Sequence, residues 1–215
     1  MHYTSVLFDL DGTLLDTLGD LTAAMNRTLT RHGLPERTRQ QMRAALGNGA
    51  RQLMELSVPA GTDGALFEML LAEYNADYAA HCRIETAPYP GVDALLRQLH
   101  AQGRKLAIVS NKPDEAVRAL RAEFFADTVP IAVGEKQGIR RKPAPDTLLT
   151  AMAQLGAERT STVYVGDSEV DIATARAAGL PCISVLWGFR DRDLLEQAGA
   201  QQFAADTGEL ARLLD

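Results

Sequence analysis

VLFDLDGTLLDT, residues 6–17, carries an apolar run that ends in two aspartates one residue apart, Asp9 and Asp11. The continuous apolar run is typical of a strand that is buried on both faces. Two carboxylates at the tip of such a strand repel each other and resist desolvation. Because this arrangement is costly, it indicates a functional site at the end of the strand.

Similar apolar runs recur along the chain and alternate with helix-like segments. The further expected strands are 105–111, 129–134, 161–167 and 182–188, and the expected helices are 91–103, 114–124, 145–155 and 169–178. Proline at the start and glycine at the end of these helices is ordinary helix punctuation. The alternation predicts right-handed βαβ units, and therefore an α/β fold with a parallel sheet.

The segment between the first two strands is far longer than a βαβ crossover requires. Most of it has helical patterning, over 17–32, 37–46, 50–57 and 63–82, and it returns through a linker rich in proline at 84–92. We therefore expect an inserted helical domain at 17–86 and a core domain formed by 1–16 and 87–215.

Polar side chains collect where the predicted strands end, which is the edge where open parallel sheets bind ligands. They are Asp9, Asp11, Gly12 and Thr13 after the first strand, Ser110, Asn111 and Lys112 after the second, and Asp167, Ser168 and Asp171 after the strand at 161–167, with Lys142 before a further helix. Converging carboxylates suit a hard cation such as Mg²⁺, which also recruits a phosphate.

Four of these segments together resemble the haloacid dehalogenase superfamily. They are DLDGT (9–13), Ser110 in IVSNKP, Lys142 in RRKPAPD and GDSEVD (166–171), in the order and on the elements that the family uses. The resemblance implies a Rossmann-like core with an inserted helical cap. Dehalogenases proper have the pattern DxYGT, so the second acid, Asp11, indicates phosphoryl transfer and a phosphoric monoester hydrolase.

The resemblance also implies roles for the acids. Asp9 would be the nucleophile that forms an aspartyl-phosphate, and Asp11 the general acid and then the base. Asp9 and Asp167 would bind Mg²⁺ through their carboxylates and Asp11 through its backbone carbonyl. Asp171 would orient the metal waters or Lys142, although it could also be a helix first-turn acid.

The remaining polar residues would hold the phosphoryl group. Ser110, Asn111 and Lys142 would neutralise its oxygens, and Gly12 and Thr13 would contact substrate. Ser168 could support this set or only cap its helix, and Thr13 could be only a turn hydroxyl. Lys112 is expected to be solvated, with a catalytic role as the alternative.

Within the superfamily, LGNGARQLM (46–54), SNKP (110–113) and VLWGFR (185–190) resemble the phosphoglycolate phosphatase-like subfamily. Gly49 and Arg51 in the first of these would bind the carboxylate of a small acidic phosphate, or Arg51 would be a solvated surface arginine. Pyrophosphatase, sugar-phosphate phosphatase and phosphoglucomutase activities stay open. A receiver-like phosphorylated switch is a non-enzymatic alternative.

Composition limits the partners and the compartment. The net charge is −6 with no long basic cluster, so nucleic acid is not an expected partner. No apolar run approaches the ~18 residues of a membrane span, and no signal peptide is recognised at the N-terminus. Two cysteines without a CxxC pattern favour the cytoplasm. We expect a small phosphorylated metabolite as partner and a monomer or homodimer.

Overall fold

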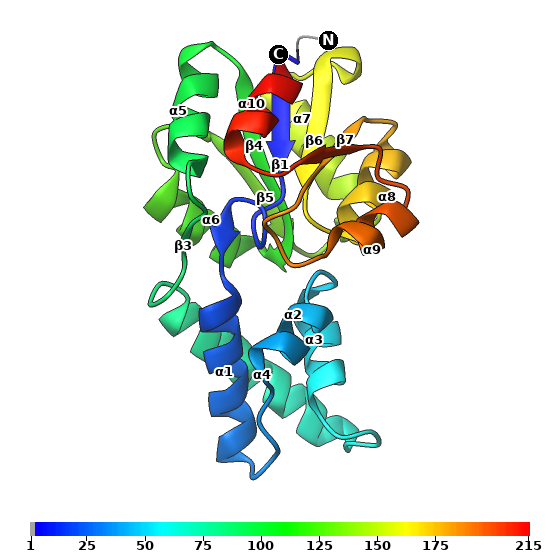
Figure 1. The fold of residues 1–215 in the computed structure, drawn as a ribbon. Coiled ribbons are helices and arrows are strands. Elements are labelled where there is room, and N and C mark those ends of the chain that lie inside the picture. The colour runs from blue at the N-terminus through cyan, green and yellow to red at the C-terminus, as the bar shows by residue number, and fades with distance from the viewer. Residues whose placement is uncertain (1–2) are drawn as a thin grey trace. The chain divides into compact units, whose positions relative to one another are not determined.

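The computed structural model describes residues 3–215 and is drawn in Figure 1. The chain forms two compact units. The helical unit is Asp16–Ala87, and the core unit is Pro88–Asp215 together with the segment that ends at Leu15.

A six-stranded parallel sheet is the centre of the core unit, in the order β5-β4-β1-β6-β7-β8. Its strands are β1 (Ser5–Phe8), β4 (Lys105–Pro113), β5 (Ile131–Glu135), β6 (Thr162–Gly166), β7 (Cys182–Val185) and β8 (Gln202–Ala204). β1 lies between β4 and β6, with Phe8 aligned with Ile108 and Val165. The predicted α/β fold with a parallel sheet is confirmed.

Helices cover both faces of this sheet. They are α5 (Val92–Ala101), α6 (Asp114–Phe124), α7 (Asp146–Leu155), α8 (Glu169–Ala178), α9 (Arg192–Gln197) and α10 (Thr207–Leu214), with a 3₁₀ turn at Arg159–Ser161. α7 and α8 pack together over one apolar core, in which Leu7 and Val109 of the sheet meet Leu148 and Ala175 of the helices. The alternate strand residues are also fully buried, and α5 contacts β4 and α10.

The C-terminal part of the core unit contains three elements that the sequence did not predict: α9, β8 and α10. β8 is a three-residue edge strand, QFA, paired with β7 alone. A strand this short has no hydrophobic periodicity, so its pattern is not distinguishable from a loop.

The helical unit consists of α1 (Leu18–Arg31), α2 (Arg39–Ala45), α3 (Gly49–Ser57) and α4 (Gly64–His81). α1 packs on α2 and α4, and α3 packs on α2 and α4. Two short strands, β2 (Leu15–Asp16) and β3 (Ala87–Pro88), pair with each other where the chain enters and leaves this unit. Within residues 3–215, no helix is both long and apolar enough to cross a bilayer.

The chain segment that leaves the helical unit is held by a single carboxylate. Asp20, in the first turn of α1, is buried and accepts backbone N–H groups from Ile84, Glu85 and Thr86 at 3.0, 2.9 and 2.9 Å. Three hydrogen bonds to one carboxylate satisfy a charge that burial would otherwise leave unsolvated. The start of α1 and the segment 84–86 are therefore fixed to each other.

Candidate active site

The carboxyl ends of β1, β4 and β6 bring the polar segments of the sequence to one edge of the core sheet. Asp9 follows β1, Ser110 lies in the last part of β4, and Asp167 follows β6. All three residues are buried. Their neighbourhood follows directly from the strand order, because β1 pairs with β4 on one side and β6 on the other.

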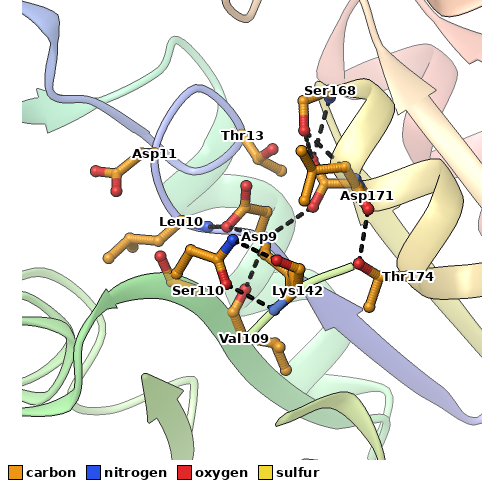
Figure 2. Close-up of polar contacts among 12 residues, drawn as sticks. Asp9, Leu10, Asp11, Thr13, Val109, Ser110, Lys142, Ser168, Asp171 and Thr174 are labelled. Atoms are coloured by element: carbon orange, nitrogen blue, oxygen red, sulfur yellow. Dashed lines mark hydrogen bonds and ion pairs between the residues drawn. The ribbon is translucent and has the colours of Figure 1, made fainter. Parts of the chain in front are cut away.

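Lys142 lies at the centre of this cluster, with its side chain 2% exposed (Figure 2). Its Nζ is 2.9 Å from Asp9 Oδ1 and 2.7 Å from Asp171 Oδ1, and it donates to the Tyr164 hydroxyl at 3.0 Å. A buried ammonium needs this degree of pairing. Lys142 therefore joins the nucleophile candidate to the first turn of α8.

Asn111 fixes the backbone of Lys142 from across the site. Its Oδ1 accepts the Lys142 N–H at 2.8 Å, and its Nδ2 donates to the Lys142 carbonyl at 3.0 Å. Asn111 was predicted to bind substrate, and in the structure its amide holds the lysine. Ser110 Oγ accepts the N–H of Lys112 at 3.2 Å, which shapes the end of β4.

Asp167 is held at both carboxylate oxygens. Oδ1 accepts the Thr13 hydroxyl at 3.1 Å, and Oδ2 accepts the backbone N–H of Phe189 at 2.7 Å. The chain packs tightly here: a Cβ on Gly12, which has φ +83°, would lie 2.3 Å from Asp167 Oδ2. A Cβ on Gly188 would lie 2.3 Å from the Asp167 Cβ. Both glycines therefore serve the close approach of backbone to this carboxylate.

Asp171 belongs to the same network through its second oxygen. Ser168 donates to Asp171 Oδ2 with its hydroxyl at 2.6 Å and its N–H at 3.1 Å, while Tyr164 donates its hydroxyl to Oδ1 at 2.9 Å. Ser168 is also the N-cap of α8 in a capping box. Ser168 therefore both caps α8, because its Oγ accepts the Asp171 N–H at 3.4 Å, and supports the Asp171 carboxylate through its hydroxyl.

The cluster holds more negative charge than it neutralises. Burial raises the pKa of the Asp9 carboxyl well above its usual range, and repulsion by Asp171 and Asp167 adds to this against the attraction of Lys142. Burial and the charge of Asp171 likewise raise the pKa of Asp167 to about 7. Two acids that resist ionisation beside one ammonium indicate a place where further positive charge is favourable.

Asp171 and Lys142 form the stable pair in this cluster. Burial acts to raise the pKa of Asp171, but Lys142, Ser168 and Tyr164 outweigh it and hold that pKa below its usual value. Burial acts to lower the pKa of Lys142, but Asp171 and Asp9 outweigh it and raise that pKa. Lys142 is therefore charged at every physiological pH.

The donor atoms fit a hard cation. One carboxylate oxygen from each of Asp9, Asp167 and Asp171 lies within 4.8 Å of the others. An all-oxygen set with excess negative charge is what Mg²⁺ prefers. Asp171 is the third carboxylate of this group, but its oxygens already accept from Lys142, Tyr164 and Ser168, so Asp9 and Asp167 are the two carboxylates with capacity for a cation.

Asp11 and Lys112 form a second pair beside the cluster. Lys112 Nζ is 3.2 Å from Asp11 Oδ1, and the lysine side chain is only 4% exposed. The prediction of a solvated Lys112 is therefore wrong, because this side chain is buried against a carboxylate. Figure 2 shows the Asp11 side chain directed away from Asp9, Lys142 and Asp171.

Three groups of the site escaped sequence analysis. The hydroxyl of Tyr164 is hidden in an apolar strand pattern, and Phe189 contributes only a backbone N–H. Trp187 donates its indole N–H to the Thr13 carbonyl at 3.0 Å. The segment VLWGFR was noted for its resemblance to a subfamily, but its letters do not reveal that its backbone holds a carboxylate.

Gly49 and Arg51, the substrate-binding candidates of the helical unit, lie at the start of α3. Gly49 is its first residue, with φ +80°. The guanidinium of Arg51 forks the Glu68 carboxylate, with NH1 and NH2 each 2.8 Å from an oxygen, and lies 5.3 Å from the Phe67 ring centroid. The Arg51 side chain is 48% exposed. Arg51 was predicted to form paired hydrogen bonds with a substrate carboxylate, and in the structure it forms them with the Glu68 carboxylate.

The chain belongs to the haloacid dehalogenase-like hydrolase family, which it matches over residues 6–185. This range includes the four motif segments, DLDGT (9–13), Ser110, Lys142 and GDSEVD (166–171), and ends before Trp187, Gly188 and Phe189.

Its relatives narrow the class to phosphoric monoester hydrolases of the phosphoglycolate phosphatase-like kind. A phosphoglycolate phosphatase of Xanthomonas campestris pv. campestris is 37% identical over 187 residues, covering 86% of this chain and 84% of that protein. An N-acetylmuramic acid 6-phosphate phosphatase of Pseudomonas aeruginosa is 31% identical and covers 100% of this chain and 96% of that protein. A solved structure from Lactobacillus delbrueckii subsp. bulgaricus, provisionally named a phosphoglycolate phosphatase, is 36% identical with a TM-score of 0.94, covering 100% of this chain and 99% of that chain.

Proposed function

We propose that this enzyme is a Mg²⁺-dependent phosphatase that hydrolyses a small phosphate monoester, 2-phosphoglycolate first, through a phosphorylated Asp9. The observation that carries the proposal is the position of Lys142, 2.9 Å from Asp9 and 2.7 Å from Asp171 in a buried cluster. Such a cluster offers a nucleophile and a fixed cation where a phosphoryl group would be transferred.

In the first step, an Asp9 oxygen attacks phosphorus and the bond from phosphorus to the ester oxygen breaks. Asp11 gives its proton to the departing oxygen. In the second step, Asp11 takes a proton from water, whose oxygen attacks phosphorus and releases phosphate and Asp9. Lys142 and the Ser110 hydroxyl hold the phosphoryl oxygens, and Asn111 keeps Lys142 in place.

Asp9 and Asp167 would hold the metal through their carboxylates and Asp11 through its backbone carbonyl, while Asp171, whose oxygens accept from Lys142, Tyr164 and Ser168, would stand beside this set. When bound there, Mg²⁺ would neutralise the phosphate dianion and the acids beside it, which would lower the repulsion between Asp9 and the phosphoryl group. Thr13 and the Phe189 N–H orient Asp167 for this purpose. Gly12 lets the chain approach that carboxylate closely.

We also propose that residues 17–86 form a cap domain that gates the site of the core domain, 1–16 and 87–215. Supporting this, the structure divides the chain close to these boundaries, at Asp16 and Ala87. Closing such a domain excludes water while the substrate reacts. Gly49 and Arg51 are its candidate substrate ligands, and Arg51 would have to exchange Glu68 for the substrate.

The relatives support 2-phosphoglycolate and give one second candidate. The Xanthomonas campestris relative is named for phosphoglycolate, and the Pseudomonas aeruginosa relative for N-acetylmuramic acid 6-phosphate. Both compounds are carboxylic acids as well as phosphate monoesters. A sugar phosphate that carries a carboxylate is therefore the second candidate.

Neither Cys82 nor Cys182 forms a disulfide within residues 3–215, which supports a reducing cytoplasm, in which we propose that the enzyme acts on a small metabolite as a monomer or homodimer.

The experiment is a phosphate-release screen of the purified protein with Mg²⁺. The panel holds 2-phosphoglycolate, N-acetylmuramic acid 6-phosphate, pyrophosphate, a neutral sugar phosphate and an aryl phosphate. We expect the highest kcat/KM for 2-phosphoglycolate, and a phosphorylated Asp9 in rapidly quenched samples by mass spectrometry. A higher kcat/KM for pyrophosphate or the neutral sugar phosphate would contradict the substrate, and turnover without phosphorylated enzyme would contradict the mechanism.

A further inference from the structure

Lys112 is a buried cation to which the mechanism above gives no task. It is the penultimate residue of β4, at the same end of the sheet as Asp9 and Asp167. Its side chain is 4% exposed, and its Nζ is 3.2 Å from Asp11 Oδ1. Lysine rarely occupies a buried position unless a specific interaction requires it there.

The irregular backbone at the end of β4 sets the direction of the Lys112 side chain. The pairing of β4 with β5 shifts register between Val109 and Pro113, and the Lys112 N–H donates to Ser110 Oγ at 3.2 Å. Irregularities of this kind change the direction of side chains next to active sites. A regular strand end would give the side chain of Lys112 a different direction.

The phosphoryl group does not need this second ammonium. Lys142 already lies between Asp9 and Asp171, and Lys112 is paired instead with Asp11. In the proposed mechanism Asp11 acts on the ester oxygen that departs. As the ion-pair partner of Asp11, Lys112 would therefore lie on the leaving-group side of the site.

We propose that Lys112 is a specificity-determining residue of the core unit that binds an anionic leaving group, such as the carboxylate of a phosphorylated 2-hydroxy acid. This inference rests on the proposed function and assigns the substrate carboxylate to a core residue. An ammonium is a compact point charge, so it suits a carboxylate only one carbon from the ester oxygen. Lys112 and Arg51 each already pair with a carboxylate, Asp11 and Glu68, but Lys112 is buried at the sheet edge that holds Asp9, whereas Arg51 is half-exposed on the helical unit.

The test compares two esters that differ only in this group: 2-phosphoglycolate and 2-hydroxyethyl phosphate. We expect Lys112→Met to lower kcat/KM for 2-phosphoglycolate by ~30-fold and for 2-hydroxyethyl phosphate by less than ~3-fold. Lys112→Arg, which keeps the charge, should recover part of the loss. Lys105→Met is the matched control, because Lys105 lies at the opposite end of β4, is exposed and binds the Gly156 carbonyl. It should leave both values unchanged.

A second measurement needs no variant and covers the case in which Lys112→Met fails to fold. Glycolate should inhibit the wild-type enzyme at least ~10-fold more strongly than ethylene glycol, because only glycolate carries the anion. Equal inhibition would overturn the inference.

The outcomes separate this inference from the proposed function. Equal losses on both esters would make Lys112 a positioning residue for Asp11, and no loss on either would make it structural; each overturns the inference while the phosphatase stands. Wild-type protein that hydrolyses no phosphate monoester would overturn the proposed function, and the inference with it.

Discussion

Two buried aspartates, Asp167 in the core unit and Asp77 in the helical unit, meet opposite surroundings. Asp77, with its side chain 3% exposed, accepts from Arg27 NH2 at 2.6 Å and Arg31 NH2 at 3.2 Å. Burial acts to raise its pKa, but these arginines and His81 outweigh it and lower that pKa. For Asp167, burial and the charge of Asp171 outweigh the hydrogen bonds from Phe189 and Thr13, and they raise its pKa to about 7.

The contrast separates a charge that supports folding from one that opposes it. Asp77 is ionised and paired, so its charge stabilises the helical unit. Asp167 and Asp9 are acids that the fold holds against their own repulsion. Strain of this kind persists where a ligand relieves it, and the function proposed above supplies such a ligand for the core unit, a cation and then a phosphate.

The largest effect is expected from Asp9→Asn. The amide is not a competent nucleophile, so kcat should fall by at least ~1,000-fold and no phosphorylated protein should form. Because the substitution also removes a repelled charge, the melting temperature in chelator should be unchanged or higher. Activity within tenfold of the wild type would exclude Asp9 as the nucleophile.

Removal of the metal should abolish catalytic activity at the core site and leave the helical unit folded. In excess chelator we expect at least a 100-fold loss of activity, restored by added Mg²⁺. Mg²⁺ should also raise the melting temperature, and this shift should shrink in Asp167→Asn, which gives a readout independent of turnover. Full activity in chelator would contradict the metal site.

Asp77→Ala should do the reverse of Asp9→Asn and destabilise the protein. Arg27 and Arg31 lose a shared partner, but their side chains are 35% and 55% exposed, so water recovers part of the energy. We expect a loss on the order of 2 kcal/mol in urea unfolding. Glu55→Ala, at an exposed position of the same unit, is the control and should cost less than about 0.5 kcal/mol. A stable Asp77→Ala protein would remove the contrast.

The two acids should also differ in their pH dependence. Asp9 and Asp167 have raised pKa values in the folded state, so the folded state holds their protons longer than the unfolded chain does. The free energy of unfolding in chelator should therefore fall from about pH 4 to pH 7, on the order of 2 kcal/mol. Asp77, with a lowered pKa, contributes stability above about pH 4 that is lost as the pH falls further. Asp167→Asn should flatten the fall between pH 4 and 7, and an unchanged slope would contradict the burial effect.

The smallest effect is expected from Arg51→Ala. The Arg51 and Glu68 side chains are both exposed to solvent, which screens their ion pair, so the stability of the protein should not change measurably. If Lys112 binds the substrate carboxylate, kcat/KM for 2-phosphoglycolate should change by less than ~3-fold. A tenfold loss confined to substrates with a carboxylate would instead support Arg51 as their ligand.

Sequence analysis predicted the elements whose signals are local. The apolar strands and the order of the motifs predicted that Asp9, Ser110, Lys142 and Asp167 lie at one edge of the sheet. This prediction was possible because the carboxyl ends of all strands of a parallel sheet lie at the same edge. The helices of the insertion followed from their periodicity, with boundaries that agree with the structure to within two residues.

The remaining features depend on tertiary contacts that no local pattern encodes. Lysine side chains are usually solvated, so the sequence does not indicate that Lys112 is buried. Its burial beside Asp11 occurs at the irregular end of β4, which is a feature of the folded structure. Asp77 and Arg27 are 50 residues apart in sequence, and neither has a motif. Every residue except proline has a backbone N–H. The identity of residue 189 as phenylalanine therefore does not predict the hydrogen bond from its N–H to Asp167.

The paired strands β2 and β3 have an evolutionary consequence. The inserted sequence leaves and rejoins the chain at adjacent positions, and Asp20 ties its exit to its entry. When the two ends of an insertion lie side by side, the entropic cost of closing the chain over it rises only slowly with the length of the insertion. Such a segment can be exchanged by recombination for one of different size without rewriting β1 or β4. The inserted segment and the core sheet can then diversify independently within one gene.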